Sequence, residues 1–143
     1  MTSEDKELLL KDFCGRLPYK IKAQIPDEYG GYTSIIESID IDGFVVDFEG
    51  AQIEIECIKP YLFPMSSMNR AQREEFIKFA DYEPRAEDCG RHQELYYYDL
   101  VGHENNLYPN SDAIDWLNKN HFDYRGLIPR GLAKDATGLN IYK

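Results

Sequence analysis

The chain has little cysteine, no long apolar run and no basic leader, and each shortage excludes a class of protein. Its three cysteines, Cys14, Cys57 and Cys89, are odd in number and widely spaced, so they provide no disulfide framework. The longest apolar stretches are far shorter than the roughly 20 residues that a membrane helix needs. No basic start precedes an apolar run, so we expect no secretory signal. We therefore predict a cytoplasmic protein with reduced thiols and without a membrane partner.

Cations are also scarce. The chain has 16 Lys and Arg residues against 26 Asp and Glu residues, which gives a net charge of -10. The acids concentrate in residues 19–63 and 81–110, whose net charges are -6 and -5. Such segments repel phosphate backbones, so we expect no direct contact with nucleic acid. The sequence also lacks a Walker loop and a dinucleotide fingerprint, and it predicts no cofactor.

What the chain does contain is typical of one α+β domain spanning residues 1–143. Hydrophobic residues make up 43%, and a chain of this length can bury a core without metals or disulfides. The aromatic content is high, with 11 Tyr, 7 Phe and one Trp. Aromatic side chains bury large areas, and the polar tip of Tyr suits core edges and interfaces.

Four segments predict strands, over residues 19–25, 32–39, 44–48 and 52–58. Tight turns link them, including the Asp42-Gly43 pair, so we expect an antiparallel meander with one apolar face. Four strands of this length are also compatible with a small SH3-like barrel. Residues 94–101 predict a fifth strand because tyrosines favour the β conformation.

Helices are expected to cover the apolar face of this sheet. The N-terminal helix spans about residues 4–15, is capped by Ser3 and places Leu9, Phe13 and Cys14 on one apolar stripe. Two further short helices are predicted, over about residues 67–80 and 111–120. Residues 59–64 carry two prolines, and we expect them to leave the sheet as an extended connector.

The terminal block, residues 121–142, is apolar, rich in glycine and more basic than the rest of the chain. Its cations Arg125, Arg130 and Lys134, with Tyr61 nearby, are candidates for binding an anion at glycine turns. The favoured interpretation is packing instead. The two arginines would then pair with acids of the sheet, and His121 would close the preceding helix. The apolar residues expected to pack onto the sheet are Leu127, Ile128, Leu132, Leu139 and Ile141.

The central segment holds the weakest candidates. Cys89, His92 and His103 have metal-ligand side chains, but His103 stands alone, so a second close pair of ligands is missing. An ordinary polar loop explains them better. Cys14 and Cys57 fall on predicted apolar faces and are interpreted as small buried hydrophobes. The last candidates form a partner-contact patch whose alternative is an edge strand beside the core: Tyr96, Tyr97 and Tyr98.

Three segments carry a resemblance to a known family: residues 8–19, residues 58–68 with the motif Lys59-Pro-Tyr-Leu-Phe-Pro64, and the terminal block. Together they cover about a third of the chain. They resemble a family of short hypothetical proteins common in Bacteroides genomes and their mobile elements. The resemblance implies a bacterial cytoplasmic protein. The family has no assigned activity, so the resemblance supplies no catalytic residues.

Three functional hypotheses follow. The first is a small non-enzymatic binding or regulatory module that contacts another protein, since the chain is acidic, rich in tyrosine and without a catalytic set. The second is an acidic nucleic-acid mimic that inhibits a DNA-binding protein; it requires regularly spaced carboxylates on one face. The third is a small anionic-ligand binder or enzyme that uses the Arg125 and Arg130 region.

Overall fold

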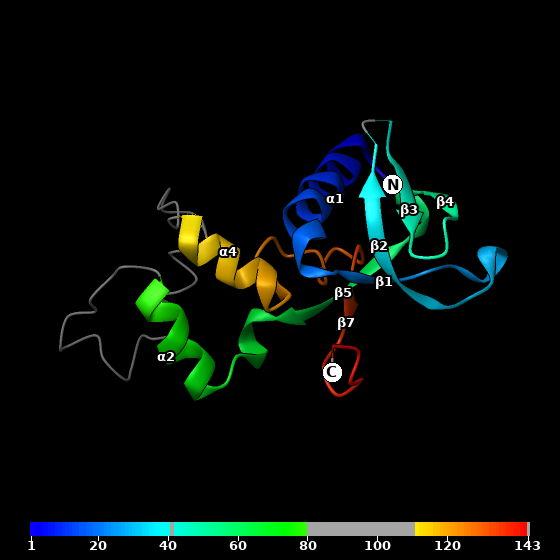
Figure 1. Ribbon diagram of the computed structural model, residues 1–143. Helices are drawn as coiled ribbons and strands as arrows, with labels where there is room; N and C mark the ends of the chain where they lie inside the picture. Colours follow the sequence, from blue (N-terminus) through cyan, green and yellow to red (C-terminus); the bar gives the residue numbers. More distant parts are fainter. Residues whose placement is uncertain (41, 80–110, 143) are drawn as a thin grey trace.

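The computed structural model describes residues 1–40, 42–79 and 111–142, and within them the protein is an α+β fold built on a seven-stranded sheet. The strands lie in the order β4-β3-β2-β1-β5-β6, and β7 also pairs with β5. Helix α1 lies beside the strands, whereas α2 and α4 lie together on the side of the sheet opposite β4 (Figure 1). No helix in these ranges is long and apolar enough to cross a membrane.

Helix α1 (Ser3–Arg16) is capped by Thr2 rather than by Ser3, because the Thr2 hydroxyl accepts a hydrogen bond from the backbone N–H of Asp5 at 3.1 Å. Leu9 and Phe13 face the core as predicted, but Cys14 is exposed. The buried stripe of α1 includes two charged residues instead, Asp12 and Arg16. The prediction that Cys14 is a small buried hydrophobe was therefore wrong, because the buried stripe passes through Asp12 and not through Cys14.

The first hairpin starts later than the alternating pattern indicates. A 3-10 turn, η1 (Leu17–Tyr19), and the left-handed Lys20 precede β1 (Lys22–Gln24). The chain then passes through η2 (Asp27–Tyr29) into β2 (Thr33–Ile39), which pairs antiparallel with β1. The predicted apolar face of this segment is confirmed, since Ile21, Ala23 and Ile25 are all buried.

The rest of the meander is β3 (Phe44–Asp47) and β4 (Gln52–Glu54). Asp40 stabilises the turn before β3, because its carboxylate accepts from the backbone N–H groups of Asp42 and Phe44. Gly43 has a positive φ of 87°, which glycine adopts at low cost. The strand predicted over residues 52–58 ends early, because η3 (Ile55–Cys57) turns the chain and leaves Cys57 half-buried.

The predicted connector is in fact an internal strand, β5 (Lys59–Pro64). It pairs antiparallel with β1 and parallel with two short strands of the terminal block, β6 (Phe122–Asp123) and β7 (Lys134–Asp135). Because β5 pairs with these strands instead of returning to β4, the described residues form an open sheet and not a closed barrel. The sheet has more strands than the four or five predicted, and residues 94–101 lie outside the described ranges.

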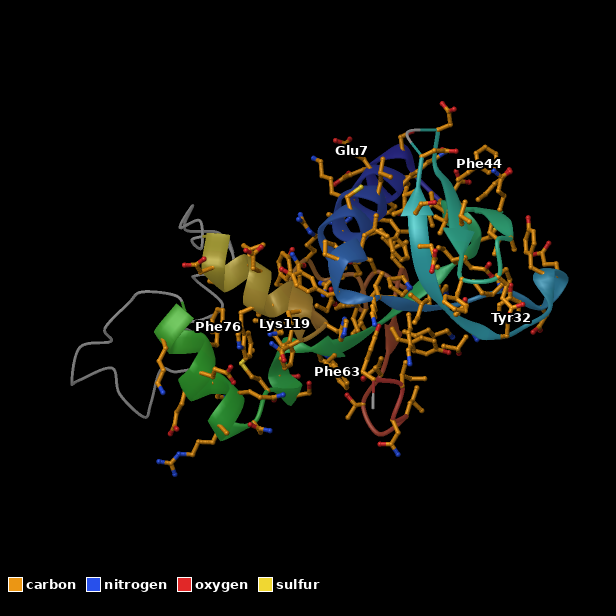
Figure 2. All side chains as sticks on the ribbon, in the orientation of Figure 1. Glu7, Tyr32, Phe44, Phe63, Phe76 and Lys119 are labelled. Carbon is orange, nitrogen blue, oxygen red and sulfur yellow. The ribbon has the colours of Figure 1, made fainter. Side chains whose placement is uncertain are left out.

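The short turn η4 (Met65–Ser67) leads from β5 to α2 (Arg70–Phe79), and α4 (Ser111–Lys119) packs against it. Asn69 caps α2 reciprocally with Gln72, so this helix begins three residues later than predicted. Figure 2 shows Phe76 on α2 on the side of α4, where its ring lies 5.5 Å from that of Trp116. The two helices thus enclose a second hydrophobic cluster, separate from the main core between α1 and the sheet.

Candidate functional site

The terminal block is largely a packed segment, as predicted. Leu127 and Leu132 are buried in the main core, and Ile128 and Ile141 are half-buried. Leu139 was predicted to pack as well, but it is 54% exposed. It lies in a turn that follows β7, where the chain has already left the sheet.

The two arginines of the block pair with acids of α1, so the prediction that they pair with acids of the sheet was wrong. The Nη1 atom of Arg130 lies 3.2 Å from the Oδ1 atom of Asp5. The Nε atom of Arg125 lies 3.5 Å from the Oδ1 atom of Asp12. The reason is topological: between β6 and β7 the block passes beside α1 (Figure 1), so both arginines meet acids of this helix before the chain pairs with the sheet again at β7.

A buried ion pair that sequence reasoning missed joins α1 to this block. The Arg16 guanidinium donates to Asp12 at 2.8 and 3.1 Å and to the carbonyl oxygen of Phe122 at 2.6 Å. Arg16 and Arg125 both lie against the ring of Tyr124, at 5.2 and 5.1 Å from its centroid. The signal was present in the sequence, because Asp12 and Arg16 are four residues apart and flank Phe13 on the apolar stripe.

His121 and Tyr142 close the block. His121 ends the turn after α4 with a left-handed φ of 62°, and its backbone N–H donates to the carbonyl oxygen of Asn118. Its ring stacks on that of Tyr142 at 3.7 Å. The Tyr142 hydroxyl donates to the carbonyl oxygen of Tyr61 at 2.7 Å and accepts from the Lys22 backbone N–H at 3.1 Å. Burial, with nearby Arg16 and Lys22, lowers the pKa of His121 to about 4, so the imidazole is neutral at pH 7.

The candidate anion-binding residues are therefore dispersed. Tyr61 is buried, and Lys134 is exposed on the neighbouring strand β7 in register with it. Arg125 and Arg130 each already contact a carboxylate, which weakens their attraction for a second anion. This geometry gives the anion-binding hypothesis no support.

The remaining candidates lie outside the described residues: Cys89, His92, His103, Tyr96, Tyr97 and Tyr98. Within the described ranges, no group of three His, Cys, Asp or Glu side chains is placed to hold a metal ion.

A pocket of about 230 Å³ lies along α4, with Glu75 of α2 and Tyr19 also in its lining. Trp116 contributes to its wall, and three carboxylates surround it with one ammonium group, that of Lys119. The carboxylates belong to Glu75, Asp112 and Asp115. The acidic lining is unsuited to an anion.

The charged residues of the meander are almost all acidic. Residues 23–58 contain nine acids and no Lys, Arg or His. Two of these acids are satisfied internally, since Asp47 is buried and bonded to Tyr32, and Glu56 pairs with Lys6 of α1 at 2.9 Å. The other acids are exposed: Asp27, Glu28, Glu37, Asp40, Asp42, Glu49 and Glu54.

Exposed aromatic side chains lie among these acids. Phe44, Val46 and Phe48 alternate along β3 and its end, so they point away from the buried Val45 and Asp47. Phe44 is 39% exposed and Phe48 is 66% exposed. Figure 2 shows Phe44 on the side of the meander remote from α1. We call this surface the outer face, and its members are Ser38, Phe44, Val46, Phe48, Gln52 and Glu54.

Sequence reasoning did not single out the outer face. The alternation of residues 44–48 was a usable signal, because it puts two phenylalanines opposite the buried Val45. The pattern alone does not show which side of the strand is covered, since both sides carry apolar residues.

Comparisons with family models, with curated proteins and with solved structures found no match to this chain. The resemblance of residues 8–19, 58–68 and 121–142 to a family therefore stays a prediction.

Proposed function

We propose that the protein is a non-enzymatic binding module that contacts another protein through the outer face. The observation that carries the proposal is the exposure of Phe44 and Phe48 on a sheet face surrounded by carboxylates. Aromatic side chains are enriched where proteins touch, because they bury a large area at a small cost in conformational entropy.

Burial of the exposed phenylalanines would stabilise a complex with a partner protein. Burying apolar surface stabilises a complex by about 25 cal/mol for each Å² removed from water. Phe48 is two-thirds exposed, so covering its ring and that of Phe44 would release this free energy on binding. The surrounding acids raise the rate of encounter with a basic partner and disfavour acidic ones.

The nucleic-acid mimic remains a second candidate, because Lys22 at the start of β1 is the only cation of the meander and residues 23–58 contain none. Its geometric requirement is a regular row of carboxylates. The exposed acids of the meander lie instead in η2, in both turns and on the strands, with phenylalanines between them. The acidic residues 81–110 lie outside the described ranges. The protein-binding module is therefore favoured.

The test compares capture of partners by the wild-type chain and by the double variant Phe44→Ser/Phe48→Ser. A control is Leu139→Ser, which removes an apolar side chain of intermediate exposure, 54% against 39% for Phe44 and 66% for Phe48, from the terminal block. Quantitative mass spectrometry of cell extract should find a protein that the wild type and the control retain and the double variant loses. Equal recovery of every protein by all three chains, each folded by circular dichroism, would overturn the proposal.

A further inference from the structure

We infer that Phe44 and Glu54 together form a subsite on the outer face for an arginine side chain of the partner. The inference rests on the proposed function and names the chemistry that the partner must supply. It follows from how β3 and β4 are paired.

The register brings the two side chains together. The backbone N–H of Ile55 donates to the carbonyl oxygen of Gly43 at 2.8 Å, and that of Asp47 donates to Ala51 at 3.1 Å. In an antiparallel ladder hydrogen-bonded pairs alternate with non-hydrogen-bonded pairs, whose Cα atoms are closer, at about 4.5 Å. Phe44 and Glu54 are opposite each other and form one of the closer pairs. Their exposed side chains therefore lie next to each other on the same face.

An aromatic ring beside a carboxylate matches the guanidinium group. The flat cation of arginine stacks on an aromatic face, and its N–H fork donates to carboxylate oxygens. Lysine offers a compact and more strongly hydrated charge that uses this geometry less well.

The molecule already contains a similar contact of an arginine with a ring and a carboxylate at a partly buried position. There Arg125 lies 5.1 Å from the centroid of the Tyr124 ring and 3.5 Å from the Asp12 carboxylate.

Residues 23–58 contain no cation that could fill the subsite. Lys22, at the start of β1, donates instead to the carbonyl oxygen of Ile141 at 2.8 Å. Among the described residues, the Glu54 carboxylate has no hydrogen bond or ion pair. Lys6 acts on Glu54 through its field, but its ammonium group is bound to Glu56 at 2.9 Å. The subsite thus offers a carboxylate and an aromatic ring, and the cation that binds them has to come from another molecule.

The experiment titrates the whole chain with the capped peptide Arg-Val-Arg-Val-Arg and with the same peptide containing citrulline, which lacks the charge. Binding is followed by the amide resonances of Phe44 and Glu54. The arginine peptide should shift them saturably, and its affinity should fall at least fivefold in Glu54→Gln. Glu49→Gln removes an equal charge from the next turn and should change the affinity less than twofold. Citrulline should bind at least tenfold more weakly.

Equal binding of the two peptides, no saturable shift at low salt, or equal losses in the two glutamine variants would overturn the subsite. This failure is distinct from failure of the proposed function. A captured protein that depends on Phe44 and Phe48 but is retained by Glu54→Gln would sink the arginine subsite and leave the binding module standing.

Discussion

At the residue scale, the most consequential side chains are charged and buried. Asp12 and Arg16 are fully inaccessible and bond to each other, and Arg16 also donates to the carbonyl oxygen of Phe122. A buried pair of this kind adds little stability beyond an apolar pair of similar volume. Breaking it is costly, because the buried Asp12 carboxylate would keep, among the described residues, only the partly exposed Arg125, 3.5 Å away, as a partner. Its value here is geometric, because it connects α1 to the terminal block at one defined point.

The first prediction concerns this pair. Arg16→Met should lower the free energy of unfolding by about 3–5 kcal/mol, since the Asp12 charge stays buried. The double variant Asp12→Leu/Arg16→Met removes both buried charges. The Phe122 carbonyl oxygen still accepts from the Tyr124 backbone N–H at 3.1 Å, and the partly exposed Arg125 loses its carboxylate partner. The expected loss is therefore smaller, about 1–3 kcal/mol. Urea unfolding followed by circular dichroism measures both. A double variant no more stable than Arg16→Met would contradict this account.

The second prediction concerns pH. The folded pKa of His121 is about 4, below the value of about 6.5 in an unfolded chain. The unfolded state therefore binds more protons between these values, and the contribution of His121 to stability should fall as pH drops from 6.5 to 4. The loss approaches about 3 kcal/mol at pH 4 and is absent above pH 7.

His121→Asn is the matched variant for this effect, because asparagine tolerates the left-handed backbone and does not titrate. The variant should be less stable at pH 7, since the stacking on Tyr142 is lost, but its stability should depend less on pH between 4 and 6.5. Urea titrations of both chains at pH 7, 6 and 5 give the comparison. Parallel pH profiles would show that His121 is not the titrating group.

At the element scale, local patterns predict local structure and miss pairing across the chain. The hairpin of β2 and β3 and the helix α4 follow from alternation, turn residues and capping signals close in sequence. Strand β5 was missed because its two prolines indicate a connector, while its partners β6 and β7 lie some 60 to 70 residues later. The outer face was missed because exposure depends on what covers each side of the sheet.

The third prediction tests the terminal block as an element. A chain that ends after Asp123 lacks Leu127, Leu132 and the strand β7, which pairs with β5. The two buried leucines, each worth about 1.5–3 kcal/mol, together approach the stability of an ordinary domain, and the pairing of β7 with β5 is lost as well. Thermal unfolding by circular dichroism should show no cooperative transition. A truncated chain with an unchanged melting temperature would show that the block is dispensable for folding.

At the scale of the whole molecule, two hydrophobic clusters have to behave as one unit. The main core lies between α1 and the sheet, and the second cluster lies between α2, α4 and β6. Arg16 of the first region bonds to the backbone of Phe122 in the second, and β5 runs between them. These links couple the two regions mechanically.

The fourth prediction follows from this coupling. Trp116, the sole tryptophan, reports on the second cluster, while far-ultraviolet circular dichroism reports on the whole chain. The two signals should give the same unfolding midpoint. Phe76→Ala, which opens a cavity beside Trp116, should lower both midpoints together by about 3–5 kcal/mol in free energy. A shift of the fluorescence midpoint alone would divide the chain into two independent units.

The meander between Lys22 and Lys59 has a practical consequence for finding its partner. With no lysine or arginine in residues 23–58, it offers trypsin no cleavage site, and it carries no amine for a lysine-directed cross-linker or for acetylation. Cross-linking of amines followed by mass spectrometry would therefore detect no contact within residues 23–58, even when a partner covers the outer face. Reagents that couple carboxylates, and a protease that cuts beside acidic residues, are the ones able to record a contact there.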